Sequence, residues 1–179
     1  MDIVELDKYI ASFIQGGFGQ ADMAVMKEEC EKLKAGDVYV EIGVDEGRSA
    51  RVAHEYCPEG VYKIFIDIHD PTHTPNLNRA EFMEQEGMVG LGKKGFYVHG
   101  DADEFSNIFQ GEIALLFIDG HHDYESIKRN DKQWWWKVKK GGVILYHDYD
   151  HPDVKRYLDE EYGDRKEVLH GKMVKVICE

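Results

Sequence analysis

Short apolar runs alternate with helix-like segments along most of this chain, and this alternation constrains the fold more than any other feature. Strands joined by crossover helices form parallel sheets, so the order predicts an α/β protein with helices on both faces of a mostly parallel sheet. Ile113–Asp119 is almost entirely apolar, as expected for a strand buried on both faces. Strands are predicted at residues 37–42, 61–67, 95–99, 113–119 and 142–147, and helices at residues 46–56, 78–86, 103–108, 123–138 and 152–162.

Further elements flank the alternating part. The predicted elements are helices at residues 5–14 and 20–34 before it, and a closing antiparallel hairpin of residues 167–170 and 173–178 after it. The four prolines and the dispersed glycines mark no linker between domains. We therefore expect a single domain over residues 1–179, made of N-terminal helices (1–35) and an α/β core (36–179).

The charge of the chain restricts its partners. There are 35 acidic residues against 22 basic ones, which gives a formal net charge of −13. Such a field repels a phosphate backbone, so we expect no nucleic-acid partner. The basic residues 137–140 are interpreted as the solvated end of a helix, where cations suit the helix dipole. A small, neutral or cationic substrate fits this charge better.

The sequence predicts a cytoplasmic protein without a membrane partner. No apolar run approaches the ~20 residues that a membrane helix needs, and the acidic start lacks a signal-peptide pattern. Cys30, Cys57 and Cys178 show no paired spacing, which indicates reduced, packed cysteines rather than a disulfide framework.

Polar side chains stand where the predicted strands end. In parallel sheets, ligands bind beyond the carboxyl ends of the strands, so these side chains are predicted to share one ligand-binding edge. Helix capping would explain one or two of the positions, but it explains all six less well. The residues are Glu41, Asp67, Asp101, Asp119, His147 and Asp148.

A glycine turn follows the first of these strands. Gly43 permits a tight turn and a close approach to a ligand, and Gly47 lets the next helix pack near the strand. The spacing is not that of the dinucleotide G-x-G-x-x-G pattern. Because Glu41, Asp45 and Glu46 make the turn acidic, it suits a cationic ligand better than a phosphate.

Two further acids suggest how a nucleoside would be held. Asp67 ends the second strand, 26 residues after Glu41, where a carboxylate can accept hydrogen bonds from ribose hydroxyls. Asp101 follows the third strand and could accept a bond from an adenine amino group. Capping of the next short helix is an equally good interpretation of Asp101.

These motifs resemble class I S-adenosylmethionine-dependent methyltransferases, and more narrowly the branch of small-molecule O-methyltransferases. This branch includes antibiotic-sugar methyltransferases, cephalosporin-hydroxylase-like proteins and, more distantly, catechol methyltransferases. The resemblance covers roughly residues 36–150 and implies a Rossmann-like sheet. The motifs that carry it are EIGVDEGRS (41–49), FID (65–67), GDA (100–102), FIDGHHDYE (117–125) and KKGGVILYHDY (139–149).

The resemblance implies a role for each cofactor residue. Gly43 and Gly47 would contact the methionine portion of S-adenosylmethionine, and Glu41 would help to hold its amino group. Asp67 would bind the ribose and Asp101 would lie near adenine. The other residues assigned to the cofactor are Ser49 and Asp119.

A metal and a base are expected at the chemical end of the site. The resemblance implies a divalent metal at Asp119, His147 and Asp148, and such oxygen-rich ligands suit Mg²⁺ or Mn²⁺. His147 replaces an acid or amide of the family, which shifts the preference towards Mn²⁺, Fe²⁺ or Zn²⁺. His122, ahead of His121, is the expected base, and Asp119 joins them as a catalytic residue.

Alternatives stay open from the sequence. A nicotinamide-dependent oxidoreductase could use the same half-sheet, although the glycine spacing argues against it. A third hypothesis, after the methyltransferase and the oxidoreductase, is a non-catalytic S-adenosylmethionine-binding protein, because fold does not guarantee activity. The methyl acceptor is equally open among a sugar, a phenol and an amine, and residues 69–77 stand where a lid would be.

The triple tryptophan supplies a candidate for self-association. Helical spacing predicts that Trp134 faces the core, that Trp135 lies at its margin and that Trp136 points outward. Trp136 is therefore a candidate contact in a homo-oligomer, or it only covers the stems of lysine side chains. Because the chain has few residues to cover a substrate, a second subunit could also complete the pocket.

Overall fold

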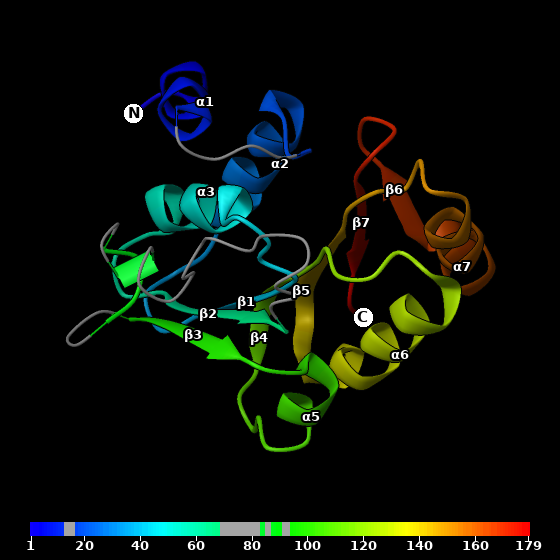
Figure 1. Cartoon of the computed structure of the whole chain (residues 1–179). Coiled ribbons are helices and arrows are strands. Elements are labelled where there is room, and N and C mark those ends of the chain that lie inside the picture. Colours follow the sequence, from blue (N-terminus) through cyan, green and yellow to red (C-terminus); the bar gives the residue numbers. More distant parts are fainter. Residues whose placement is uncertain (13–16, 69–82, 85–86, 91–93) are drawn as a thin grey trace.

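The computed structural model describes residues 1–12, 17–68, 83–84, 87–90 and 94–179. Its centre is a seven-stranded sheet in the order β3-β2-β1-β4-β5-β7-β6 (Figure 1). The strands are β1 (Val38–Ile42), β2 (Tyr62–Asp67), β3 (Gly95–His99), β4 (Ile113–Ile118), β5 (Val138–Tyr146), β6 (Lys166–Val168) and β7 (Val174–Ile177).

The sheet is parallel from β3 to β5 and antiparallel at its C-terminal edge. All six residues of β4 are buried, because β1 and β5 flank it and helices cover both of its faces. The predicted closing hairpin is confirmed as β6 and β7, which pair with each other while β7 pairs with β5. The predicted fold class is thus confirmed.

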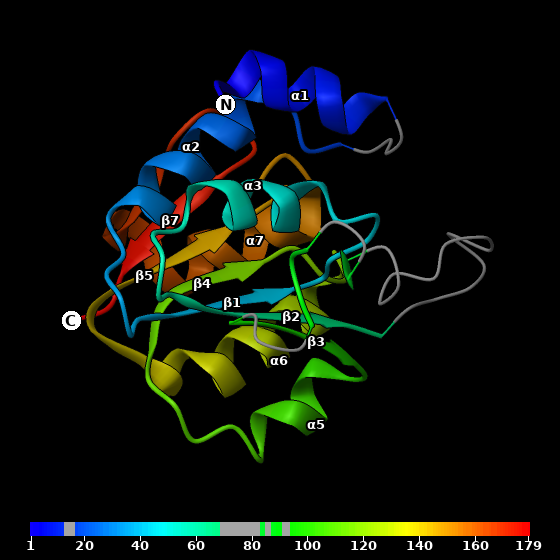
Figure 2. The ribbon, with the colours of Figure 1, turned by 90° about the vertical axis from the view of Figure 1, so that its left-hand side faces the viewer.

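Helices form one layer on each face of the sheet (Figure 2). Alternate residues of a strand point to opposite layers, so Leu115 and Phe117 join the core under the first layer, and Leu116 and Ile118 join the core under the second. By the cores that they line, the first layer holds α1 (Ile3–Ala11), α2 (Gln20–Glu31) and α3 (Arg48–Tyr56), and the second holds α5 (Ala102–Ser106), α6 (Tyr124–Trp134) and α7 (Pro152–Tyr162).

The helix predicted at residues 123–138 is too long. It ends at Trp134, a 3-10 turn follows at Trp135–Lys137, and β5 begins at Val138 rather than at residue 142. The sequence marks this start of β5 only weakly, because the pairing there is irregular: Val138 pairs with Ile113 before the register shifts. The interpretation of residues 137–140 as a helix end is therefore wrong, since most of them belong to the strand.

The tryptophans lie as predicted. Trp134 is fully buried, Trp135 is half-buried, and Trp136 is 84% exposed. Two other predictions, the helix at residues 78–86 and the lid at residues 69–77, fall almost wholly outside the described residues. Among the residues that are described, no helix has both the length and the apolar character needed to cross a bilayer.

Candidate functional site

The carboxyl ends of β1, β4 and β5 meet at one edge of the sheet, and backbone pairing continues past the strand ends there. The Asp119 N–H donates to the Ile42 carbonyl at 2.8 Å, and the His147 N–H donates to the Ile118 carbonyl at 3.1 Å. Gly43 likewise donates its N–H to the Ile66 carbonyl of β2 at 2.9 Å. The predicted polar edge therefore forms by ordinary extension of the parallel ladder.

Gly43 allows the closest approach at this edge. Its φ angle is +85°, and a Cβ added here would lie 2.1 Å from the carbonyl oxygen of Asp119. Both the backbone conformation and the contact exclude a side chain. The glycine turn after β1 and the first residue after β4 thus form a single packed unit.

Asp67 holds this turn from the neighbouring strand. Its Oδ2 accepts hydrogen bonds from the backbone N–H groups of Val44, at 2.7 Å, and Asp45, at 2.8 Å. The turn needs an unusual backbone conformation, because Asp45 and Gly47 also have positive φ angles, +44° and +87°. Any ribose contact by Asp67 would come in addition to this support.

Glu41 is buried behind the turn. It is 0% exposed, and its carboxylate accepts hydrogen bonds from Ser49 Oγ at 2.5 Å and from the Tyr39 hydroxyl at 2.7 Å. Burial raises the pKa of Glu41 to about 8 despite these two bonds, and the charges of Asp119 and Asp67 add to the rise. Glu41 is therefore mostly protonated at neutral pH while no cation is near, and a positive charge bound nearby would favour its carboxylate form.

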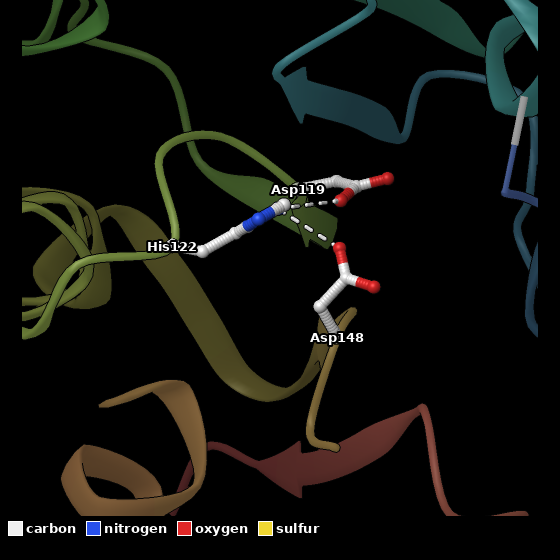
Figure 3. Close-up of side chains that lie close together, drawn as sticks. All are labelled: Asp119, His122 and Asp148. Atoms are coloured by element: carbon white, nitrogen blue, oxygen red, sulfur yellow. Dashed lines mark ion pairs between the residues drawn. The ribbon is translucent and has the colours of Figure 1, made fainter. Parts of the chain in front are cut away.

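Three of the predicted residues converge beyond β4 and β5 (Figure 3). Asp119 follows β4, His122 lies in the loop before α6, and Asp148 follows β5 with a φ of +54°. His122 Nε2 lies 2.9 Å from Asp148 Oδ2 and 3.9 Å from Asp119 Oδ1. One ligand atom from each residue lies within 4.8 Å of the others, so the group has the dimensions of a metal site.

His147 faces the same carboxylates from a buried position. It is 5% exposed, and its Nδ1 lies 3.1 Å from Asp148 Oδ2 and 3.4 Å from Asp119 Oδ1. Neither of its ring nitrogens finds a well-oriented hydrogen-bond partner among the described residues. A buried imidazole left in this way beside two carboxylates is the donor set that a divalent transition metal prefers, so these residues fit a metal ion.

The carboxylates keep both histidines charged while no metal is present. Asp119 and Asp148 raise the pKa of His122 to about 10. Burial opposes the charge on His147, yet Asp119, Asp148 and Asp22 together raise its pKa to about 12. In turn, the pKa of Asp148 falls well below its usual range, because the two histidines outweigh its burial.

Two predicted residues lie apart from this group. His121 is exposed and does not join the three-residue group. Asp101 is exposed and caps α5, accepting a hydrogen bond from the Asp103 N–H at 2.7 Å. The capping interpretation of Asp101 is thus confirmed, while its place near adenine stays a prediction.

The structure adds residues that sequence reasoning missed. Tyr39 bonds Glu41 from within β1, and Asp22 and Phe18 reach His147 from the N-terminal part of the chain. Phe18 packs on both His147 and Phe117, with ring centroids 5.5 Å and 5.8 Å away. Tyr39 and Glu41 are two residues apart on one face of a strand, a spacing that indicates such a contact. No spacing marks the contacts of Asp22 and Phe18 with His147, since they depend on how the N-terminal part of the chain docks on the sheet.

The strands and strand ends that form this site match a known protein family. Residues 40–149 match the methyltransferase domain family, and the chain belongs to that family. The match begins in β1 and ends just past Asp148, so it contains the whole strand-end edge except the residues supplied by α2. No curated protein matched the chain.

Solved structures share the fold at low identity. An S-adenosylhomocysteine-bound methyltransferase of Podospora anserina, PaMTH1, is 16% identical with a TM-score of 0.68, over 98% of this chain and 86% of that one. CalS11, a TDP-rhamnose 3'-O-methyltransferase of calicheamicin biosynthesis, is 20% identical with a TM-score of 0.67, over 99% and 86%. An O-methyltransferase of Thermotoga maritima is 14% identical with a TM-score of 0.71, over 99% and 71%.

The close approach at Gly43 yields a stability prediction. Gly43→Ala introduces both a strained φ and a clash with the Asp119 carbonyl, and we expect a loss of about 3 kcal/mol in the free energy of unfolding. Gly171→Ala is the matched control, because Gly171 has a φ of +83° but open space around the added Cβ. It should cost only about 1 kcal/mol. Urea denaturation measures both, and equal losses would contradict the packing described here.

Proposed function

We propose that this chain is an S-adenosylmethionine-dependent O-methyltransferase that acts on a small hydroxylated molecule with the help of a divalent metal ion. The observation that carries the proposal is the contact between the Gly43 turn and Asp119. It sets the glycine turn beside Asp119, which with Asp148 faces the imidazoles of both His122 and His147 at distances that suit a metal site. The chain belongs to the methyltransferase domain family. A methyl donor and an activated acceptor have to meet at such a junction.

The turn is assigned to the cofactor. S-adenosylmethionine, when bound, supplies a methyl group that its sulfonium sulfur already activates. Gly43 and Gly47 would contact its methionine portion, while Asp67 would hold the ribose and Asp101 would lie near the adenine. Glu41, kept in place by Ser49, would lose its proton more readily when a positively charged ligand lies in front of the turn, and its carboxylate would then attract that ligand. Residues 1–179 would serve this site as one domain.

Asp119, Asp148 and one imidazole are assigned to the metal ion. We assign His147 to this role because it is buried and its Nδ1 faces both carboxylates. A bound Mg²⁺ or Mn²⁺ would supply positive charge that lowers the pKa of an acceptor hydroxyl. The histidine favours Mn²⁺ over Mg²⁺, which prefers oxygen ligands.

His122 is assigned to proton transfer. Its side chain is 45% exposed, so an acceptor arriving from solvent can reach it, whereas His147 is enclosed. His122 would take the hydroxyl proton as the acceptor oxygen bonds to the methyl carbon and the carbon–sulfur bond breaks. In the metal-free protein Asp119 and Asp148 keep His122 protonated. Positive charge bound between those carboxylates would oppose that proton and favour the base form.

The acidic edge also bears on the partners of the protein. Asp119, Asp148, Asp67 and Glu41 lie together, so a neutral or cationic acceptor would bind more readily than an anion, and nucleic acid would be repelled. We further propose that the protein works in the cytoplasm. Trp136 remains the proposed contact in a homo-oligomer, since it is 84% exposed.

The proposed cofactor is tested by calorimetric titration. The wild-type chain should bind S-adenosylmethionine and S-adenosylhomocysteine, and NAD should not compete. Asp67→Ala removes the proposed bonds to the ribose, worth about 1.5–3 kcal/mol, and also the two bonds that support the glycine turn, so its affinity for S-adenosylhomocysteine should fall by at least about 10- to 100-fold. Asp164→Ala, at an exposed acid, is the control. Binding of NAD alone would contradict the proposal and favour the oxidoreductase alternative.

The two adjacent histidines separate catalysis from binding. His122→Ala should lower kcat for methyl transfer by about 10²- to 10⁴-fold, the usual contribution of a positioned base, with the affinity for S-adenosylhomocysteine unchanged. His121→Ala should stay within about threefold of wild type, because His121 lies outside the group. Transfer of a radiolabelled methyl group to a panel of hydroxylated acceptors measures both. Equal effects of the two substitutions would remove His122 from the mechanism, and a chain that binds the cofactor but methylates nothing would fit the non-catalytic alternative.

A further inference from the structure

A carboxylate from outside the matched methyltransferase residues reaches into the site. Asp22 lies in the first turn of α2 and is 3% exposed. Its Oδ2 accepts a hydrogen bond from the Gly19 N–H at 2.7 Å, which caps its own helix. Its Oδ1 points elsewhere: it lies 3.5 Å from His147 Nε2 and 3.1 Å from His170 Nε2. One oxygen thus caps the helix, and the other lies at ion-pair distance from two imidazoles without a well-oriented hydrogen bond among the described residues.

The imidazole of His147 is fixed between two sets of acids. Its Nε2 faces Asp22 on α2, and its Nδ1 faces Asp119 and Asp148 at the strand ends. Phe18 and Phe117 pack against the ring, with centroids 5.5 Å and 6.3 Å away, and the backbone N–H of His147 is bonded within the sheet. The ring therefore has little room to turn over, and each of its nitrogens faces carboxylate oxygens without forming a well-oriented hydrogen bond among the described residues.

We infer that Asp22 is a positioning residue that orients His147 so that its Nδ1 is directed at the metal ion held by Asp119 and Asp148. The inference rests on the proposed function. A histidine that ligates a metal usually donates its other ring N–H to a carboxylate, which fixes both the tautomer and the ring orientation. Asp22 is a buried carboxylate at the nitrogen that faces away from Asp119 and Asp148, and it fills this role from the N-terminal helices.

His170 also lies near Oδ1 of Asp22, and it distinguishes a purely structural role of Asp22 from a role at the metal site. It lies in the turn between β6 and β7 and shares Oδ1 of Asp22, at a shorter distance than His147 does. No contact of His170 with Asp119 or Asp148 is found in the part of the chain that the structure describes. If Asp22 only fastened α2 to this hairpin, loss of His170 would matter as much as loss of Asp22. If Asp22 orients His147, only the loss of Asp22 would weaken the metal site.

Binding of Mn²⁺ alone, followed by electron paramagnetic resonance, tests the inference without any turnover. We expect Asp22→Ala to weaken Mn²⁺ binding about 10- to 100-fold, the usual effect of losing the carboxylate behind a ligating histidine. Asp22→Asn keeps one oxygen, which can accept the Nε2–H only by giving up the bond from the Gly19 N–H, so it should recover part of that loss. His170→Ala should stay within about threefold of wild type. Affinity for S-adenosylhomocysteine, measured on each variant, should be unchanged and shows that the fold is intact.

The outcomes separate this inference from the proposed function. Wild-type Mn²⁺ binding with no loss in Asp22→Ala would overturn the role of Asp22 and leave the metal site standing. A loss in His170→Ala as large as that in Asp22→Ala would show that Asp22 acts only as a structural clamp. Absence of Mn²⁺ binding in the wild-type chain would overturn both the metal centre and this inference. The proposed cofactor is tested separately, by the calorimetric titration with S-adenosylhomocysteine. If Asp22→Ala did not fold, Asp22→Asn and His170→Ala would still decide, because a weaker Mn²⁺ affinity in His170→Ala than in Asp22→Asn contradicts the inference.

Discussion

The contact of the Gly43 turn with the backbone of Asp119 determines the arrangement of the whole site. It exists because β1 and β4 are parallel neighbours whose ladder continues beyond their last residues, with Asp119 donating to the carbonyl of Ile42. Only glycine fits against the Asp119 carbonyl, so the turn packs directly against the backbone that follows β4. The proposed cofactor position and the proposed metal position are consequently fixed relative to each other by backbone rather than by flexible side chains.

Charge balance explains the contents of this edge. Asp119, Asp148 and Asp22 bring negative charge into a largely buried region, and two histidines compensate it. Both histidines are held in the charged form while the carboxylates have no other cation. A site built in this way favours positive ligands, which agrees with a sulfonium cofactor and a divalent metal. It also gives α2 a functional part, because α2 contributes an acid to a centre otherwise formed by strand ends.

Much of this arrangement was predictable from the sequence, since a parallel sheet brings the residues that end its strands to one edge. Asp119 and Asp148 could be placed together on that ground. His122 could be placed near them because it follows Asp119 by three residues along the chain. The ring contacts of His147 could not be predicted, because they depend on side-chain packing from α2. Nor could the early start of β5, where the pairing is irregular. Asp22 gave no signal, because a lone acid in the first turn of a helix normally indicates only a cap.

A crystal structure of the chain soaked with S-adenosylhomocysteine and Mn²⁺, with anomalous data collected at the manganese edge, tests the central claim most directly. The account predicts an anomalous peak between Asp119 and Asp148, within ligand distance of a histidine, and cofactor density against the turn at Gly43. A metal peak elsewhere, or cofactor density away from that turn, would contradict it.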